Sequence, residues 1–182
     1  QPHFPGYPIF SFFAKCIYII SGSMGITFSL LGALSIYFII YYSINILNLK
    51  INSTIGLFTA SIIFLNPLMW LMSNRYMPDL MGLAFAIASF FYLINKKKNL
   101  LDVCIGFFLF GLLAGIRLSY LPFLFIPMGY HLILNKKKSI LILWLLMGLL
   151  IWLVPLVLLT GFSDLWIMAM QHTSGHFKDY GG

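Results

Sequence analysis

The side chains that could do chemistry in this chain stand between long apolar segments, not within them. Both arginines, Arg75 and Arg117, occupy such positions. A guanidinium presents a planar fork of N–H donors that can grip a phosphate or a carboxylate with two bonds. The candidate substrate-binding residues are these arginines and the histidines, tyrosines and aspartates near them or in the terminal segments: His3, Tyr7, Arg75, Asp79, Arg117, Tyr120, His172, His176 and Asp179.

Each charged candidate also has a structural interpretation. An arginine at the end of a span can extend its head group toward lipid phosphates, and Arg75 could pair with Asp79, one helical turn further along. Asp79 follows Pro78, where a helix dipole favours an acid without any function. Its alternative roles are to orient Arg75 or to bind a metal. The sequence leaves these alternatives open.

The C-terminal histidines have the spacing of a zinc pair but lack its context. His172 and His176 stand at i and i+4, which places two ligands on one helix face. Ser174 and Gly175 weaken such a helix, and the chain contains no glutamate to act as a base. We therefore favour a loop that shapes a substrate pocket, with a plain solvated loop as the alternative.

Four other residues receive structural predictions. Cys16 and Cys104 lie in apolar surroundings without a CxxC motif, so we expect buried free thiols. Asp102 follows a lysine triplet and is expected to be an acid at a helix N-terminus. His131 lies near the end of a short apolar segment and is expected to be structural.

Composition places this chain in a membrane. Hydrophobic residues make up 61% and charged residues 8% of its 182 residues, whereas soluble domains carry about 25% charged residues. The net charge of +7 does not indicate a nucleic-acid partner, because six of the eleven basic residues form two lysine triplets between apolar runs. We expect an all-α, polytopic helix bundle forming a single transmembrane domain over residues 1–182. Its Gln1 start and glycine end suggest an internal fragment of a longer chain.

A bilayer-spanning helix needs about 20 apolar residues. Suitable runs cover residues 24–47, 54–72, 77–94 and 140–160, and the 37 residues 99–135 can cross twice. Pro122 and Pro127 should kink or break the second of these passes, 119–134. Residues 9–22 are short and contain Lys15, so we expect an interfacial helix. The prediction is about six spans plus this helix.

Lysines give the expected orientation. Lys50, Lys96–Lys98 and Lys136–Lys138 should face the cytoplasm by the positive-inside rule. The remaining connections should then be extracytoplasmic: residues 1–10, 73–79, 115–120 and 161–182. All the candidate site residues fall on this second face, which predicts a working face on the extracytoplasmic side of the membrane.

The N-terminal stretch "PHFPGYP" belongs to that face. Proline fixes φ and suits extended structure, and Gly6 permits a turn. The stretch is therefore predicted to be a rigid loop that presents His3 and Tyr7, with a simple membrane-entry turn as the alternative.

Four motifs together resemble bacterial membrane glycosyltransferases of the GT-C superfamily, related to the protein O-mannosyltransferase and lipid A sugar-transferase groups. They are "QPHFPGYP", "SNRYMPDLMGLAFAIASFF", "GLLAGIRLSYLPFLFIP" and "HTSGHFKDYGG". The resemblance implies transfer of a sugar from a polyprenyl-phosphate donor to a lipid, glycan or protein acceptor outside the cytoplasm. It implies a catalytic acidic residue upstream of Gln1 and allows a divalent metal, for which this chain offers no clear ligand set.

That resemblance also implies roles for the candidates. Arg75 and Arg117 would contact the carrier phosphate, and His3 and Tyr7 would line the sugar pocket. His172, His176 and Asp179 would close that pocket.

The competing interpretation is a transporter or flippase, which should show broken helices and polar groups near the middle of the membrane. Asn66 with Pro67 is the main such feature. A non-catalytic membrane scaffold is a third interpretation, which the uneven distribution of polar residues argues against.

Overall fold

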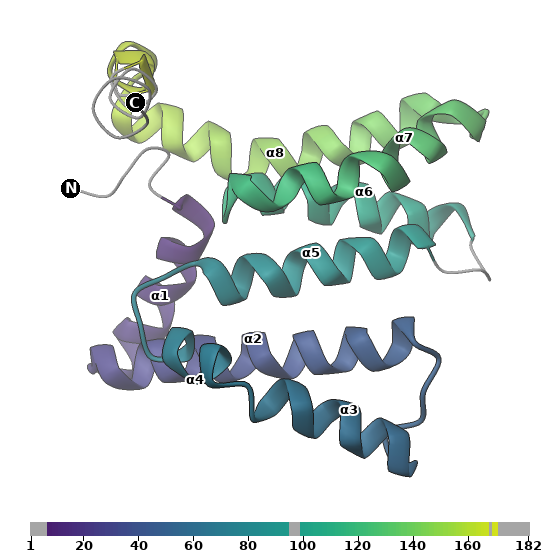
Figure 1. Cartoon of the computed structure of the whole chain (residues 1–182). Coiled ribbons are helices and arrows are strands. Elements are labelled where there is room, and N and C mark those ends of the chain that lie inside the picture. The colour runs from purple at the N-terminus through teal and green to yellow at the C-terminus, as the bar shows by residue number, and fades with distance from the viewer. Residues whose placement is uncertain (1–6, 95–98, 168, 171–182) are drawn as a thin grey trace, which may run out of the picture.

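The computed structural model describes residues 7–94, 99–167 and 169–170, which form helices joined by short turns, with no strand in these ranges (Figure 1). The all-α prediction is confirmed. The helices are α1 (Pro8–Ser21), α2 (Met24–Ile46), α3 (Thr54–Phe64), α4 (Pro67–Ser73), α5 (Asp79–Ile94), α6 (Leu100–Ala114), the 3-10 helix η1 (Leu118–Leu124), α7 (Phe125–Leu134) and α8 (Lys138–Thr160).

Helices α2, α5, α6 and α8 form the body of the molecule. In Figure 1, α2 and α5 run side by side, and α1 lies across their ends. Helix α6 packs most extensively against α8 and α5, and α5 packs against α2. The largest buried cluster centres on Phe107 and Leu113 of α6 and Leu141 of α8, all fully buried.

Helix α1 has clear sequence limits and one buried face. Pro8 stands in its first turn, and Gly22 ends it in the left-handed region, with its N–H bonded to the Tyr18 carbonyl. Ile9 and Phe10 are buried in a cluster with residues of α2, α5 and the α6 end, whereas the apolar side chains on its outer face stay exposed. Its 14 residues span about 21 Å. This is shorter than a bilayer core, so α1 is not among the span candidates, and its interfacial position stays a prediction.

Two helices are long and apolar enough to span a membrane. They are α2 and α8, each of 23 residues, and they confirm the runs 24–47 and 140–160. The bent pair α3–α4 makes a third candidate, while the other apolar helices have 10–17 residues. The prediction of six spans is therefore not confirmed, although integral membrane character is supported.

The apolar run 54–72 forms two helices, α3 and α4, which meet at a bend of 53° and together remain a span candidate. Proline cannot continue the helical hydrogen-bond ladder, so Pro67 starts a new helix instead. The Asn66 side chain accepts the Leu68 N–H at 2.9 Å. The Trp70 indole N–H donates to the Phe64 carbonyl. Two backbone groups at the break, the Leu68 N–H and the Phe64 carbonyl, therefore have side-chain hydrogen-bond partners. Such pairing is required of backbone groups in the membrane interior.

The segment that follows α6 changes from a 3-10 helix to an α-helix without interruption, so the predicted irregularity is a change of helix type and not a break. Pro122 lies inside η1, and a regular helix starts only at Phe125. The predicted structural role of His131 is confirmed, because its ring is buried and its Nε2 atom lies 2.9 Å from the Leu93 carbonyl oxygen.

The prediction for Asp102 is confirmed. The Asn99 side chain accepts the Asp102 N–H while the Asp102 carboxylate accepts the Asn99 N–H, a capping box that opens α6. The prediction of buried free thiols is confirmed for Cys104 and only in part for Cys16, which is free but partly buried.

The connections between helices lie at two opposite ends. One end, on the left of Figure 1, holds the α1–α2, α4–α5 and α6–η1 connections; the other holds the α2–α3 and α7–α8 connections. Arg75 and Arg117 belong to the first end, which we name the arginine end. Lys50 and Lys136–Lys138 belong to the second, the lysine end. The predicted separation is confirmed for these residues; Lys96–Lys98 lie outside the described residues, and the compartment each end faces stays a prediction.

Cysteine labelling tests the predicted orientation. Ser119→Cys at the arginine end and Asn52→Cys at the lysine end both replace exposed residues, in a background with Cys16→Ala and Cys104→Ala. In intact cells a membrane-impermeant maleimide should modify only Ser119→Cys. In inverted vesicles it should modify only Asn52→Cys. Modification of both from one side would contradict the predicted topology.

Candidate anion-binding site at the arginine end

Three segments that are far apart in sequence meet at the arginine end. Arg117 stands directly before η1, Asp79 is the first residue of α5, and Tyr7 directly precedes α1. The backbone also joins these segments, because the Ile9 N–H donates to the Gly115 carbonyl at 3.2 Å. Tyr7 has φ 48°, a left-handed conformation that is uncommon for a non-glycine residue.

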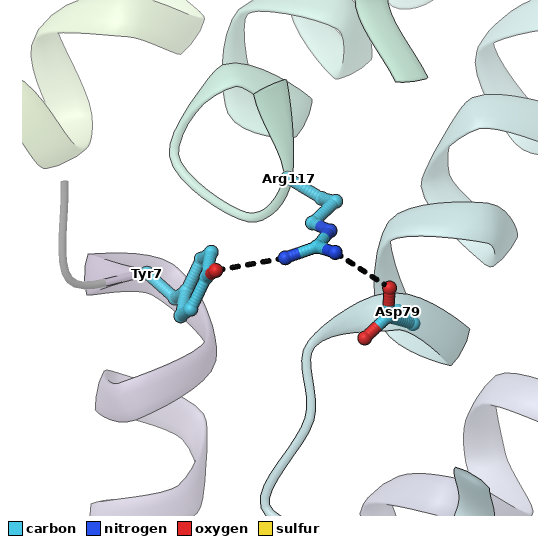
Figure 2. Close-up of polar contacts among 3 residues, drawn as sticks. All are labelled: Tyr7, Asp79 and Arg117. Carbon is cyan, nitrogen blue, oxygen red and sulfur yellow. Dashed lines mark hydrogen bonds and ion pairs between the residues drawn. The ribbon is translucent and has the colours of Figure 1, made fainter. Parts of the chain in front are cut away.

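The Arg117 guanidinium holds both other side chains (Figure 2). Its Nη1 donates to the Tyr7 hydroxyl at 2.7 Å, and its Nη2 lies 3.0 Å from Asp79 Oδ1. The guanidinium carbon also lies 5.6 Å from the centre of the Tyr7 ring, within cation–π range. We name Tyr7, Asp79 and Arg117 the Arg117 clasp. The Arg117 and Asp79 side chains are 31% and 27% exposed, so solvent only partly screens the pair.

The clasp corrects one alternative from the sequence. Asp79 pairs with Arg117 and not with Arg75. Pairing at i and i+4 requires one continuous helix, but Arg75 precedes α5 in a turn where the Met77 N–H bonds to the Arg75 carbonyl. Asp79 does stand in the first turn of α5, so its helix-dipole role is compatible with the structure.

Tyr120 lies beside the clasp. A Cβ atom added at Gly82 would lie 2.8 Å from Arg117 Cβ and 3.0 Å from the Tyr120 ring. Any side chain at Gly82 would therefore displace both residues. This close approach of α5 to η1 brings Tyr120 and Arg117 together, as their places in the motif "GIRLSYLP" suggest.

Arg75 has a different environment. Its side chain is exposed and forms no ion pair with any residue that the structure describes. The turn that carries it is nevertheless anchored, because the neighbouring Tyr76 ring packs edge-on against Phe10 and Phe28 at 5.5 and 5.3 Å. The Tyr76 and Ser11 hydroxyls lie 3.3 Å apart. The arginine end thus holds a positioned cation without a protein counter-charge among the described residues.

An apolar cavity begins beneath this turn. A small void of about 10 Å³ is lined by Arg75, Leu31, Ser35 and Met81 among others. The last three residues also line a cavity of about 250 Å³ between α2 and α5. The lining of this larger cavity is almost entirely apolar, and Phe13 of α1 and Phe85 of α5 contribute to it. A chain of shared lining residues therefore links the Arg75 turn to an apolar hollow within the helix bundle.

Several predicted site residues cannot be placed. His3, His172, His176 and Asp179 lie outside the described residues. Within residues 7–94, 99–167 and 169–170, no group of three histidine, cysteine or acidic side chains is arranged to hold a metal ion.

No family model, curated protein or solved structure matches this chain. The resemblance to GT-C glycosyltransferases therefore rests on the four sequence motifs. Of the site residues, sequence reasoning missed Tyr76 and Gly82. Both stand inside the motif "SNRYMPDLMG", where an aromatic residue beside an arginine and a glycine early in a helix were the available signals.

Proposed function

We propose that this protein is a membrane glycosyltransferase that moves a sugar from a polyprenyl-phosphate donor to an acceptor on the extracytoplasmic face. The observation that supports this most is the position of Arg75. It is an exposed cation in an anchored turn at one end of the bundle, and shared lining residues link it to an apolar cavity. A lipid phosphate combines the two matching chemistries, an anionic head and an apolar chain.

The proposed reaction breaks the bond between the anomeric carbon and the phosphate oxygen, and the electron pair stays on the phosphate. The acceptor oxygen forms the new bond to the same carbon and loses its proton to a base. A fixed cation beside the phosphate stabilises the negative charge as it develops. The Arg75 guanidinium is suited to this role because no described carboxylate neutralises it. The base is not assigned among the described residues.

Arg117 has a different proposed role from the one the sequence suggested. Its guanidinium already contacts Asp79 and Tyr7, so less of its charge is available to a second anion. We assign it as a positioning residue that holds α1, α5 and η1 together beneath the sugar. His3, His172, His176 and Asp179 remain proposed pocket residues, and so do Tyr7 and Tyr120.

A second candidate function is transport or flipping of a lipid-linked or small solute. The break between α3 and α4 favours it, because discontinuous helices are common at transporter binding sites. Against it, Asn66 and Trp70 already bond with backbone groups at this break. This leaves fewer polar groups there for a substrate than a transport site would need.

A donor assay distinguishes the two functions. Membranes containing the full-length protein should release labelled sugar from a polyprenyl-phosphate sugar but not from the corresponding nucleotide sugar. Membranes without the protein are the control. A transporter would instead move the intact labelled lipid between leaflets without cleaving its glycosyl bond. Movement without cleavage would therefore refute the transferase proposal.

A further inference from the structure

A second hollow lies along α2 at the lysine end, away from the arginine end. It has a volume of about 390 Å³, and its lining includes Tyr41, Ile44, Asn45, Leu49 and Ile51. This volume falls within the range of about 300–1,000 Å³ that is typical of small-molecule sites. The lining is mainly apolar, with the Asn45 amide among its few polar groups.

A neighbouring cavity of about 370 Å³, bordered by Phe64 and Trp70 at the α3–α4 break, shares Tyr37 and Ile40 with this hollow. We name the hollow at the lysine end the α2 groove. An apolar groove beside a membrane-spanning helix has the polarity of an alkyl chain.

The α2–α3 connection forms one wall of the groove through Leu49 and Ile51 and has a defined conformation. Asn48 adopts φ 54°, and the next N–H, that of Leu49, bonds to the Ile44 carbonyl at 3.0 Å. The Ser53 hydroxyl donates to the Lys50 carbonyl at 2.6 Å, and Gly56, the buried residue of α3, packs directly against that carbonyl. These contacts hold the connection at the end of α2.

A cation stands beside the groove. Lys50 lies between Leu49 and Ile51, both of which line it, and its side chain is exposed. Lys50 forms no ion pair within the described part of the chain, and the sequence holds no acidic residue before Asp79. The groove thus has a lysine and an amide at one end and an apolar interior, which complements an anionic headgroup joined to an acyl chain.

We propose that this groove binds an anionic phospholipid from the leaflet at the lysine end. Its phosphate lies at Lys50, and one acyl chain lies along Tyr41, Ile44 and Ile51. Basic residues near a membrane surface attract anionic lipids, and the apolar groove adds a second contact that a free phosphate could not fill. This site is independent of the proposed donor site, which lies at the opposite end of the bundle.

Native mass spectrometry of the purified full-length protein tests the proposal, with phosphatidylglycerol and phosphatidylcholine added in equal amounts. The wild type should retain phosphatidylglycerol preferentially. Lys50→Gln should reduce the retained phosphatidylglycerol about fivefold. Lys137→Gln removes an exposed lysine from the same end without touching the groove, so it should leave retention within twofold of the wild type.

A second variant tests the acyl-chain contact. Ile51→Trp fills the groove from an exposed position and should lower phosphatidylglycerol retention while Lys50 remains. Three results would overturn the proposal: equal losses in Lys50→Gln and Lys137→Gln, no preference for phosphatidylglycerol, or unchanged retention in Ile51→Trp. Millimolar inorganic phosphate should not displace the lipid. Displacement would mean that the site binds only the phosphate headgroup and that the acyl chain does not occupy the groove.

Discussion

Replacing Gly148 by alanine is expected to destabilise the protein by about 1–3 kcal/mol, the usual cost of inserting a methyl group into a tightly packed contact. Gly148 is a buried residue of α8, and a Cβ atom there would collide with the Phe108 carbonyl of α6. It would also lie 3.1 Å from Gly111 Cα. These are backbone atoms, so the helices must separate to admit the methyl group. Thermal unfolding in detergent measures the effect.

Gly129 is the matched control. It lies within α7, and a Cβ atom added there meets nothing within 4 Å. Alanine has a higher helix propensity than glycine by about 1 kcal/mol, so Gly129→Ala should be neutral or stabilising. Glycine-to-alanine substitution should thus lower the free energy of unfolding at Gly148 and leave it unchanged or raise it at Gly129. Equal effects would mean that α6 and α8 do not meet at Gly111 and Gly148.

The sequence predicted the features that depend on local composition. The apolar runs 24–47 and 140–160 correspond to α2 and α8 because length and hydropathy suffice for such helices. Proline predicted the irregular return segment around Pro122, since its effect on a helix is local. The sequence likewise marked Asn66 with Pro67 as the main feature of a broken helix, and the chain bends there between α3 and α4.

Contacts between distant segments could not be predicted in this way. Sequence proximity suggested Arg75 as the partner of Asp79, but the partner is Arg117, 38 positions further along the chain. That pairing depends on how α5, α6 and η1 pack. The Tyr7–Arg117 hydrogen bond likewise depends on α1 lying across the helix ends. The cavities beside α2 are also products of packing, and no local pattern encodes them.

Replacing Arg75 by alanine is expected to lower sugar release from the polyprenyl-phosphate donor about 100-fold, if the proposed function holds. That is the usual loss when one donor to a developing negative charge is removed. Because the Arg75 side chain is exposed and forms no ion pair among the described residues, the unfolding temperature should not change. Arg75→Lys keeps the charge but loses the planar fork, so it should retain part of the activity. Initial rates at saturating donor measure both.

Arg117→Gln is the contrasting variant. It removes the cation from a half-buried ion pair and leaves the Asp79 carboxylate without its partner. We expect a stability loss of about 1–2 kcal/mol, less than for a fully buried pair because solvent screens the exposed part. The rate of sugar release per folded molecule should fall less in Arg117→Gln than in Arg75→Ala. The opposite result would be a fully active Arg75→Ala and a stable but inactive Arg117→Gln. It would mean that the donor phosphate binds at the Arg117 clasp. Asp79 would then have to release Arg117 when the donor binds.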